Sequence, residues 1–575
     1  MKRFAAISLA LVMALGTLTA CGSSEENAVA NNTGAATVVD DENAVNPADW
    51  AAYDALIAEI KSTTDYVARE AKMHEAEDIL METGAILPLY YYNDVYMQKS
   101  NVSNIYSNLY GFKYFMFAET DATTLRLNLG SEPDYLDPAL NSSVDGACLA
   151  VNSFSGLCTY DAEGNVQLDV AEKYEVSEDG MTYTFTLLPD LKWSDGSELT
   201  ANDFVYAWNR AVAPETAADY AYMFDAIARK DDGTLNVTAD GNTLTIVLGS
   251  PCAYFLDLCA FPAYYPVKQA SVEAAADWQT NPGAWCQEAG FVTNGAYVCT
   301  AWTHDQSMTY TKNPYYHRAD EVKVETLEMM LSAEDTAIFA AYNAGDLDFI
   351  DTVPNDEIQN LLSNPEFYIV DNLGTYYVSF NVKSPLFEGK TPGQANAMRR
   401  AIALLIDRDY IAENIGQTGQ KPANTFVPDG MADGQGGIFK VNDDAYTYPD
   451  AETTGYFNPS YSEENVAEAK ALLESAGFKF GGDGMLSSET PFSFEYLTNE
   501  GTGHVAVAEA IQQDLAAVGI SMTIKTCDWN VFLDERKAGN YDIARNGWLA
   551  DFNDPINMLE MWTSESGNND CQFGR

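Results

Sequence analysis

Residues 179–208 read DGMTYTFTLLPDLKWSDGSELTANDFVYAW. Residues 181–188 alternate between polar and apolar side chains, which is typical of a strand with one buried face. The Asp179-Gly180 pair favours a tight turn, so this part reads as a hairpin. Residues 201–212 have helical spacing, and Asp203 in the first turn favours a helix start. A hairpin that leads closely into a helix predicts a mixed α/β structure.

The same mixture of patterns continues on both sides of this stretch. With 575 residues, the chain is long enough for two to four lobes. Strands and helices alternate throughout, so we expect α/β lobes joined by extended crossovers. The patterns predict strands at 86–92, 124–129, 242–247, 375–382 and 520–526, an extended aromatic segment at 105–118, two helices within 48–83, and helices at 334–345, 393–416, 464–477 and 503–518.

The composition restricts the class of partner. The chain carries 85 acidic and 31 basic residues, a formal net charge of −54. A nucleic-acid-binding protein needs the opposite sign, so we expect no nucleic-acid partner. The 34 Tyr and 9 Trp residues supply rigid amphipathic contact area that suits mixed polar and apolar ligands, although many of them fill cores.

The first residues have the pattern of an exported lipoprotein. Lys2 and Arg3 precede an apolar run that is too short for a transmembrane helix, so residues 1–20 are interpreted as a signal peptide. The run ends in LTAC, which resembles a bacterial lipobox and predicts lipidation at Cys21. An ordinary signal peptide with a chance cysteine is the alternative. Residues 21–45 are small, polar and acidic and are interpreted as a lipid-anchored flexible tether.

The reactive side chains indicate a binding protein rather than an enzyme. None of the four histidines lies in a His-Glu-x-x-His pattern, and no Gly-x-Ser-x-Gly or Walker-type motif occurs. No Cys-x-x-Cys pair occurs, so we expect no metal site and no cofactor. Beyond Cys21, eight cysteines are left, an even number that permits disulfides in an exported chain without revealing their pairing.

Several blocks, in order along the chain, resemble one family. The chain is similar to the extracellular oligopeptide-binding proteins of ABC importers, the family 5 solute-binding proteins, over nearly all of residues 46–575. The blocks are AEKY at 171–174, residues 179–187, WSDG at 193–196, TANDFVYAW at 200–208, TNGAY at 293–297, NPYY at 313–316, GDLD at 345–348, residues 401–408, and YDIARNGWLADFNDP at 541–555.

One departure from the family concerns the order of the segments. In the family an Asn-rich loop is followed by two helices, a tyrosine-rich strand and a short tail, whereas this chain stops at Arg575, just after Asn568, Asn569 and Asp570. Segments within residues 46–115 resemble the missing part and lead directly into the usual first strand at Thr124. We interpret this as a circular permutation, which is tolerated where the old ends lie close together. A rearranged gene whose product does not fold is the alternative. A permutation predicts that Arg575 lies roughly 10–20 Å from Asn46, within reach of a short loop.

The resemblance implies a bilobal, periplasmic-binding-protein-like α/β fold with an extra domain inserted in the first lobe. Hinges are expected near residues 85 and 374. The implied division assigns residues 86–155 and 268–374 to lobe I, residues 156–267 to the inserted domain, and residues 375–575 to lobe II, completed by residues 46–85.

The resemblance also implies a ligand site between the lobes. Asp551 matches the family position that pairs with a peptide ammonium group, and Arg545 matches an arginine that meets the peptide carboxylate. An intramolecular pair of Arg545 with Asp542 is the alternative. Trp548, Tyr220 and Tyr377 match walls of the cleft, and the strand with Thr375 and Tyr376 is expected to bind the ligand backbone as an added strand. Ser142 and Val144 are expected to offer backbone partners.

The function implied is a lipoprotein on the extracytoplasmic face of the bacterial cell membrane that captures peptides and delivers them to ABC transporter permease subunits. We expect a monomer that touches the membrane by its lipid anchor alone. Two alternatives stay open: the same fold binding another solute, such as a dipeptide, nickel complex or sugar, and a surface peptide receptor without transport.

Overall fold

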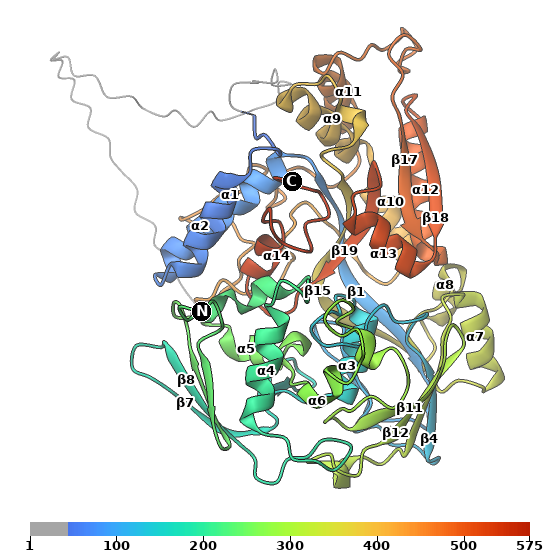
Figure 1. Cartoon of the computed structure of the whole chain (residues 1–575). Coiled ribbons are helices and arrows are strands. Elements are labelled where there is room, and N and C mark those ends of the chain that lie inside the picture. The colour runs from blue at the N-terminus through green and yellow to red at the C-terminus, as the bar shows by residue number, and fades with distance from the viewer. Residues whose placement is uncertain (1–43) are drawn as a thin grey trace, which may run out of the picture. The chain divides into compact units, whose positions relative to one another are not determined.

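The computed structural model describes residues 44–575 (Figure 1). The predicted signal peptide at 1–20, the predicted lipidation site Cys21 and all but the last two residues of the predicted tether lie outside the described residues. Within the described part, no helix is both long and apolar enough to cross a membrane.

The stretch quoted first forms a small sheet and a helix, as predicted. β7 (Ala171–Val176), β8 (Thr182–Leu187), β10 (Thr243–Val247) and β9 (Val237–Asp240) form a four-stranded sheet in that order. The helix α4 (Ala201–Ala211) begins at a capping box, because the Thr200 amide donates to Asp203 Oδ2 at 2.8 Å. Trp208 on α4 is fully buried, and its indole N–H donates to the Tyr264 carbonyl at 2.7 Å.

A second, larger sheet of 11 strands runs through the molecule. Its order is β11-β12-β13-β4-β14-β1-β15-β19-β17-β18, with β16 paired to β1. The strands are β1 (Ile86–Gln98), β4 (Thr124–Asn128), β11 (Tyr297–Thr303), β12 (Ser307–Lys312), β13 (Thr326–Met330), β14 (Phe349–Ile350), β15 (Phe367–Phe380), β16 (Lys421–Pro422), β17 (Ser493–Asn499), β18 (Ser521–Cys527) and β19 (Ile543–Leu549).

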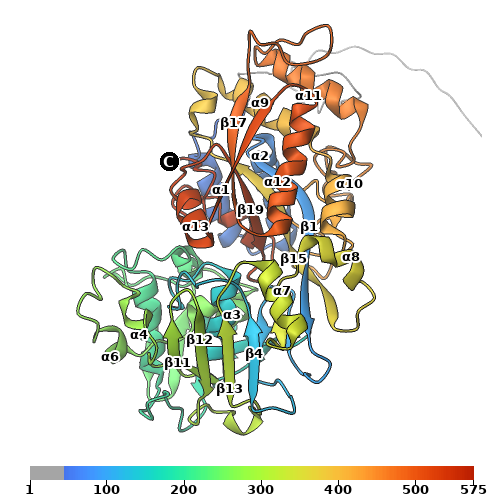
Figure 2. The same cartoon turned by 90° about the vertical axis from the view of Figure 1, so that its right-hand side faces the viewer.

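Two long strands make this sheet continuous. β1 and β15 pair antiparallel from Ile86↔Ser379 to Met97↔Phe367, with a register irregularity between Tyr91 and Asn93. At one end β1 pairs with β14, and at the other end β15 pairs with β19. Figure 2 shows β1 and β15 passing between the elements around β4 and β13 and the elements around β17 and β19. These two strands therefore connect the two halves of the sheet.

The first two helices pack against the last part of the chain. α1 (Ala51–Ser62) and α2 (Tyr66–Glu82) lie beside α14 (Ile556–Glu560) (Figure 1). The Tyr53 hydroxyl donates to the Leu559 carbonyl at 2.8 Å, and the rings of Trp50 and Phe573 stack at 4.3 Å. The Gly574 amide donates to the Pro47 carbonyl at 2.9 Å. The expected closeness of Asn46 and Arg575 is thus observed as direct contact between their neighbours.

The other helices cover the sheets, and most follow the predicted pattern. The predictions at 334–345, 464–477 and 503–518 are confirmed by α7, α11 and α12. The helices not yet given are α3 (Val144–Ser153), α5 (Phe255–Ala260), α6 (Gln269–Val272), α7 (Asp335–Ala344), α8 (Ile358–Leu361), α9 (Pro392–Leu405), α10 (Arg408–Tyr410), α11 (Glu463–Ser475), α12 (Thr502–Ala516) and α13 (Trp529–Lys537).

Two predicted elements are wrong in extent. The helix predicted at 393–416 is broken, because Ile406 is extended and the Asp407 carboxylate caps a new turn by accepting from the Tyr410 amide. The extended segment predicted at 105–118 contains only the two-residue strands β2 (Tyr106–Ser107) and β3 (Lys113–Tyr114). Between them the Asn108 side chain accepts from the amides of Tyr110 and Phe112 and folds the chain into a turn.

The cysteines form no disulfides in the described part of the chain, where all eight are free thiols and seven are buried. Among the same residues there is no group of three or more His, Cys, Asp or Glu side chains that could hold a metal ion. Cys252 and Cys259, which the sequence placed seven residues apart, pack in the core without bonding.

Candidate functional site

Asp551 lies two residues after the end of β19 and is 5% exposed. Its Oδ1 atom accepts a hydrogen bond from the Tyr220 hydroxyl at 3.2 Å, and its Oδ2 atom accepts one from Asn557 Nδ2 at 2.9 Å. The Tyr160 hydroxyl donates to the main-chain carbonyl of Asp551 at 3.1 Å. Residues more than 300 positions earlier in the chain therefore contact this carboxylate and its backbone.

Asn557, on α14, organises the loop around Asp551. Its Oδ1 atom accepts from the Asp551 amide and from the indole N–H of Trp548, each at 3.0 Å. One side chain thus orients both the carboxylate and the ring predicted to be a wall of the site. The sequence analysis missed Asn557, because a lone asparagine two residues after a proline carries no distinctive pattern.

The Asp551 carboxylate has only uncharged partners. No Lys, Arg or His side chain in residues 44–575 forms an ion pair with it. Burial raises the pKa of Asp551 to about 7, although the hydrogen bonds from Asn557 and Tyr220 work in the opposite direction. A buried carboxylate is expensive to ionise without a counter-charge. The arrangement therefore favours binding of a ligand that brings a cationic group.

Tyr220 and Trp548 lie beside Asp551 and contact each other. Their ring centroids lie 6.1 Å apart, and the Tyr220 ring also packs edge-on against Phe261 at 5.0 Å. Both side chains are less than 10% exposed. These rings exclude water around the carboxylate and so strengthen any charge–charge contact made there.

Arg545 lies on β19, the strand that precedes Asp551 in the chain. Its Nε atom donates to Asn499 Oδ1 at 2.8 Å, and its guanidinium carbon lies 5.9, 5.3 and 5.1 Å from the ring centroids of Tyr376, Trp529 and Phe532. The alternative pair with Asp542 is not formed, because Asp542 accepts from Ser384 Oγ and from the Glu495 amide. Arg545 makes no ion pair with a carboxylate of the described chain and suits an anionic group of a ligand.

The three residues predicted on one strand lie on two faces of β15. Tyr376 stacks on Tyr90 at 4.7 Å, lies near Arg545, and its hydroxyl is 3.1 Å from His504 Nδ1. Tyr377 points to the other face, where it is fully buried against Phe426 and Trp562. Thr375 is on the same face as Tyr377, and its Oγ1 atom donates to the Phe426 carbonyl at 2.8 Å.

The prediction that this strand binds a ligand backbone as an added strand is wrong. Thr375 pairs with Tyr91 of β1 on one side and with Trp548 of β19 on the other, and Tyr376 pairs with Tyr90 and Gly547. Both edges of β15 are used at these positions, so neither backbone is free for strand addition. The structure brings Tyr376 to Arg545 but places Thr375 and Tyr377 in the core.

Ser142 and Val144 lie at the start of α3. Val144 is the first residue of the helix. The Ser142 Oγ atom is 3.3 Å from Asp219 Oδ2 and accepts from Lys537 Nζ at 2.9 Å, and Lys537 also forms an ion pair with Asp219. Lys537, on α13, was missed by the sequence analysis. It links α13 to residues 142 and 219, so the observed role of Ser142 is a side-chain contact.

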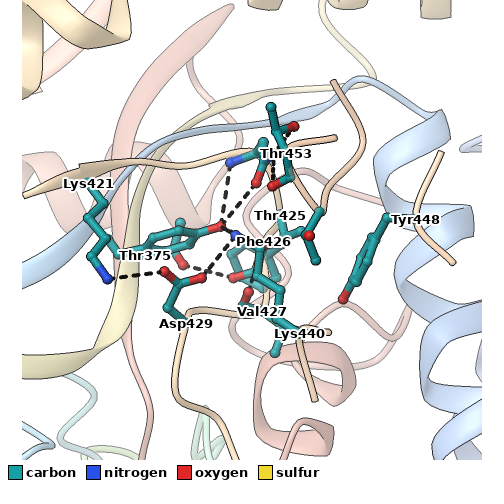
Figure 3. Close-up of polar contacts among 12 residues, drawn as sticks. Thr375, Lys421, Thr425, Phe426, Val427, Asp429, Lys440, Tyr448 and Thr453 are labelled. Carbon is teal, nitrogen blue, oxygen red and sulfur yellow. Dashed lines mark hydrogen bonds and ion pairs between the residues drawn. The ribbon is translucent and has the colours of Figure 1, made fainter. Parts of the chain in front are cut away.

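A polar cluster around Tyr91 fixes the loop that follows β16 against β1. The Tyr91 hydroxyl is 2.6 Å from both Lys440 Nζ and Thr425 Oγ1. Figure 3 shows Lys440 and Lys421 on either side of Asp429, at 2.9 and 3.7 Å. Below the cluster, Glu77 of α2 accepts from the amides of Phe426 and Val427 at 3.0 and 2.8 Å. Residues from the chain's beginning thus hold this loop.

The sequence pattern that defines the bacterial extracellular solute-binding proteins, family 5 Middle, matches residues 165–570. The chain belongs to this family. Because the family consists of solute-binding proteins, the prediction of a binding protein rather than an enzyme is confirmed.

Characterised relatives are similar over most of their length. The chain is 32% identical over 465 residues to the oligopeptide-binding protein OppA of Bacillus subtilis, covering 78% of each. It is 33% identical over 472 residues to the periplasmic oligopeptide-binding protein OppA of Salmonella typhimurium, covering 79% of each. It is 30% identical to the periplasmic murein peptide-binding protein MppA of Escherichia coli over 465 residues, 78% of this chain and 79% of that protein.

Solved structures of peptide-binding proteins have a fold similar to that of this chain. The murein tripeptide binding protein MppA of Escherichia coli superposes with a TM-score of 0.67 at 28% identity, over 78% of this chain and 84% of that chain. OppA of Haemophilus influenzae in complex with the peptide RPPGFSPFR gives a TM-score of 0.67 at 28% identity, over 79% and 85%. The predicted bilobal solute-binding-protein fold is confirmed.

Proposed function

We propose that this family 5 solute-binding protein is an extracytoplasmic lipoprotein that binds peptides between its lobes and delivers them to an ABC transporter permease. The observation that carries the proposal is the Asp551 carboxylate, which is 5% exposed and has only neutral hydrogen-bond partners. A peptide ammonium group supplies the missing positive charge. The relatives named for oligopeptide or murein peptide binding support this ligand class.

In this proposal each end of the peptide meets a side chain of opposite charge. Asp551 binds the ammonium group, with Trp548 and Tyr220 as walls, and Arg545 with Tyr376 binds the carboxylate. Between its two ends, the peptide's own side chains are held only loosely, as a receptor for many different peptides requires. Contact with both lobes stabilises the closed arrangement, so closure is a population shift driven by the ligand.

The proposed division assigns residues 86–155 and 268–374 to lobe I, 156–267 to the inserted domain, and 375–575 with 46–85 to lobe II. The Tyr220–Asp551 hydrogen bond then joins the inserted domain to lobe II. Cys21 would carry the lipid, and residues 21–45 would let the folded body stand clear of the membrane. We further propose that the segment order is circularly permuted relative to the family.

Two observations support the permuted order. Residues 47–53 contact residues 559–574 by hydrogen bonds and ring stacking, so the early segment completes a structure formed from the late one. The similarity to the B. subtilis and S. typhimurium relatives covers 78% and 79% of their length, so a similar part of each lies outside the match. Because a comparison that follows sequence order stops where a segment has moved, this shared limit fits a displaced end segment.

Native mass spectrometry of protein purified without denaturation tests the function. The expected result is a distribution of bound masses that resolves into peptides when the protein is unfolded. Asp551→Ala should lose these masses, whereas Asp433→Asn, at a carboxylate whose oxygen accepts from its own loop, should keep them. Retention by Asp551→Ala, or a bound solute without an amino group, would contradict the proposal. Peptide uptake in a strain lacking the gene then tests delivery to the permease.

A further inference from the structure

A cavity of about 240 Å³ lies outside the proposed ligand cleft, among residues 106–169, 265 and 316–318. Its walls come from β2, the residues just after β3, the end of α3, the hairpin of β5 (Cys158–Tyr160) and β6 (Val166–Leu168), and the segment around Tyr316. All of these belong to the half of the molecule that contains β4 and β13. The cavity therefore exists without any contribution from β17, β18 or β19.

Six aromatic side chains line this cavity: Tyr106, Phe117, Phe154, Tyr160, Tyr265 and Tyr316. Four of them are less than 5% exposed, so their positions are set by the core rather than by solvent. Rings packed around an open volume present negative faces that attract a cation, and the attraction grows where water is excluded.

One carboxylate in the wall is short of hydrogen-bond donors. The Asp169 side chain is 6% exposed, and its Oδ1 atom is buried without a hydrogen bond from the described residues. His317 Nε2 lies 2.9 Å from this Oδ1 atom, and the two atoms make no hydrogen bond. A buried carboxylate of this kind is stabilised by an added donor that carries positive charge.

The other charged side chains in the cavity lining, Arg318 and Asp161, already have partners within the chain. Arg318 lies over the Phe117 ring at 4.6 Å, but its guanidinium is paired with Glu321 at 2.6 Å. Asp161, at the rim, already accepts from the Asn165 amide at 2.8 Å and from Gln167 Nε2 at 3.0 Å. The formal net charge of −54 adds a long-range attraction for cations.

We propose that this cavity is a second ligand site, for a small organic cation with a ring-sized apolar body, an arylalkylammonium, whose ammonium group binds Asp169. A cavity of about 150 Å³ accommodates benzene, so the larger volume here fits one ring with a short aminoalkyl chain. The site lies next to the cleft, because the Tyr160 ring lines the cavity while the Tyr160 hydroxyl donates to the Asp551 carbonyl.

Calorimetric titration of the full chain with phenethylammonium tests this assignment. The Asp551→Ala variant is used throughout, so that the probe cannot bind the cleft carboxylate and the result is independent of the proposed peptide function. We expect one equivalent of phenethylammonium to bind, and 2-phenylethanol, which has the same body without the charge, to bind about tenfold more weakly.

Matched variants of the cavity lining test where phenethylammonium binds. Asp169→Asn should weaken phenethylammonium binding about tenfold, whereas Asp161→Asn removes a carboxylate from the same rim and should change it less than about twofold. Phe117→Leu, a change at a partly exposed ring, should weaken the ammonium probe about threefold and the alcohol less. Equal affinities for the two probes, equal effects of the two Asp variants, or no binding in the millimolar range would overturn the proposal.

Discussion

Asp551 and Asp554 lie three residues apart in one loop, and each is 5% exposed. Asp554 receives a bidentate pair from Arg69, with both N–O distances at 2.8 Å. Asp551 has Tyr220 and Asn557 as its side-chain partners, and its pKa is raised to about 7. The two carboxylates are equally buried but have different partners. Asp554 stabilises the fold through Arg69, whereas Asp551 is prepared for a cationic ligand.

The position of Arg69 in the sequence helps to explain the difference between Asp551 and Asp554. Arg69 lies on α2, in the early segment of the chain that packs against α14. Asp554 thus receives its counter-charge from the same chain, through a residue 485 positions away in the sequence. Asp551, in the same loop, is contacted only by neutral side-chain donors, Asn557 of α14 and the distant Tyr220. Ligand binding is therefore expected to depend on Asp551, and stability on Asp554 with Arg69.

Removing the guanidinium from Asp554 should have the largest effect. Arg69→Ala leaves a buried carboxylate unpaired and is expected to lower the free energy of unfolding by about 3–5 kcal/mol. Urea denaturation followed by tryptophan fluorescence measures the loss. In the double variant Arg69→Met with Asp554→Asn, most of the lost free energy of unfolding should be regained. A loss below about 1 kcal/mol for the single change would show that the two carboxylates do not differ as described.

The cationic counterpart of Asp551 is Arg545, which makes no ion pair within the described chain. Arg545→Gln should weaken binding of a peptide with a free carboxylate about 30-fold, because a charged partner is left without its donor. Binding of the same peptide as its C-terminal amide should change little. The affinity of Arg545→Lys for the peptide with a free carboxylate should lie between those of the unaltered protein and Arg545→Gln, because Lys keeps the charge without the forked geometry. Equal losses for both peptides in titration calorimetry would exclude this role.

The raised pKa of Asp551 predicts a pH-dependent affinity. An ammonium ligand needs the ionised carboxylate, so with the pKa of the free protein near 7 the affinity should fall about tenfold between pH 8 and pH 6. Binding at pH 6 should then release close to one proton per peptide. Calorimetry in two buffers with different heats of ionisation counts the protons. Affinity that stays constant or rises toward pH 6 would contradict the assignment.

The contact of Lys537 with Asp219 and Ser142 is expected to have the smallest effect. The side chains of Lys537 and Asp219 are each 22% exposed, so their pair is partly screened by solvent. Lys537→Ala should speed peptide dissociation about two- to fivefold, because the contact supports the closed arrangement. The difference should shrink in high salt. Stopped-flow dissociation at two salt concentrations checks this, and Ser142→Ala should have a smaller effect still.

Local patterns predicted much of the fold. Alternation at 182–187 and helical spacing at 201–211 reflect one buried face, which a short window of sequence records. The full length of β1 and β15 was not predicted. Asn93 and Asp94 break the apolar pattern of β1, and the pairing with β15 continues past them through a register irregularity. Long-range pairing, rather than local pattern, determines where these strands end.

The site was predictable only where a block of sequence was distinctive. Asp551, Trp548 and Arg545 fall in one such block, and the structure places Asp551 and Trp548 around Asn557. Thr375, Tyr376 and Tyr377 share a strand and are all buried, but only their side-chain contacts show that Tyr376 alone lies near Arg545. Asn557 and Lys537 depend on contacts across the fold that a linear sequence does not reveal.

Titration of a peptide recovered from the purified protein, with its amino terminus either free or acetylated, tests the central claim most directly. On the unaltered protein, acetylation should weaken binding at least about 100-fold, because a buried Asp551 is left without its counter-charge. On Asp551→Asn, the two peptides should bind with equal, weak affinity while the unfolding free energy is unchanged or higher. Equal binding of both peptides to the unaltered protein would contradict the account.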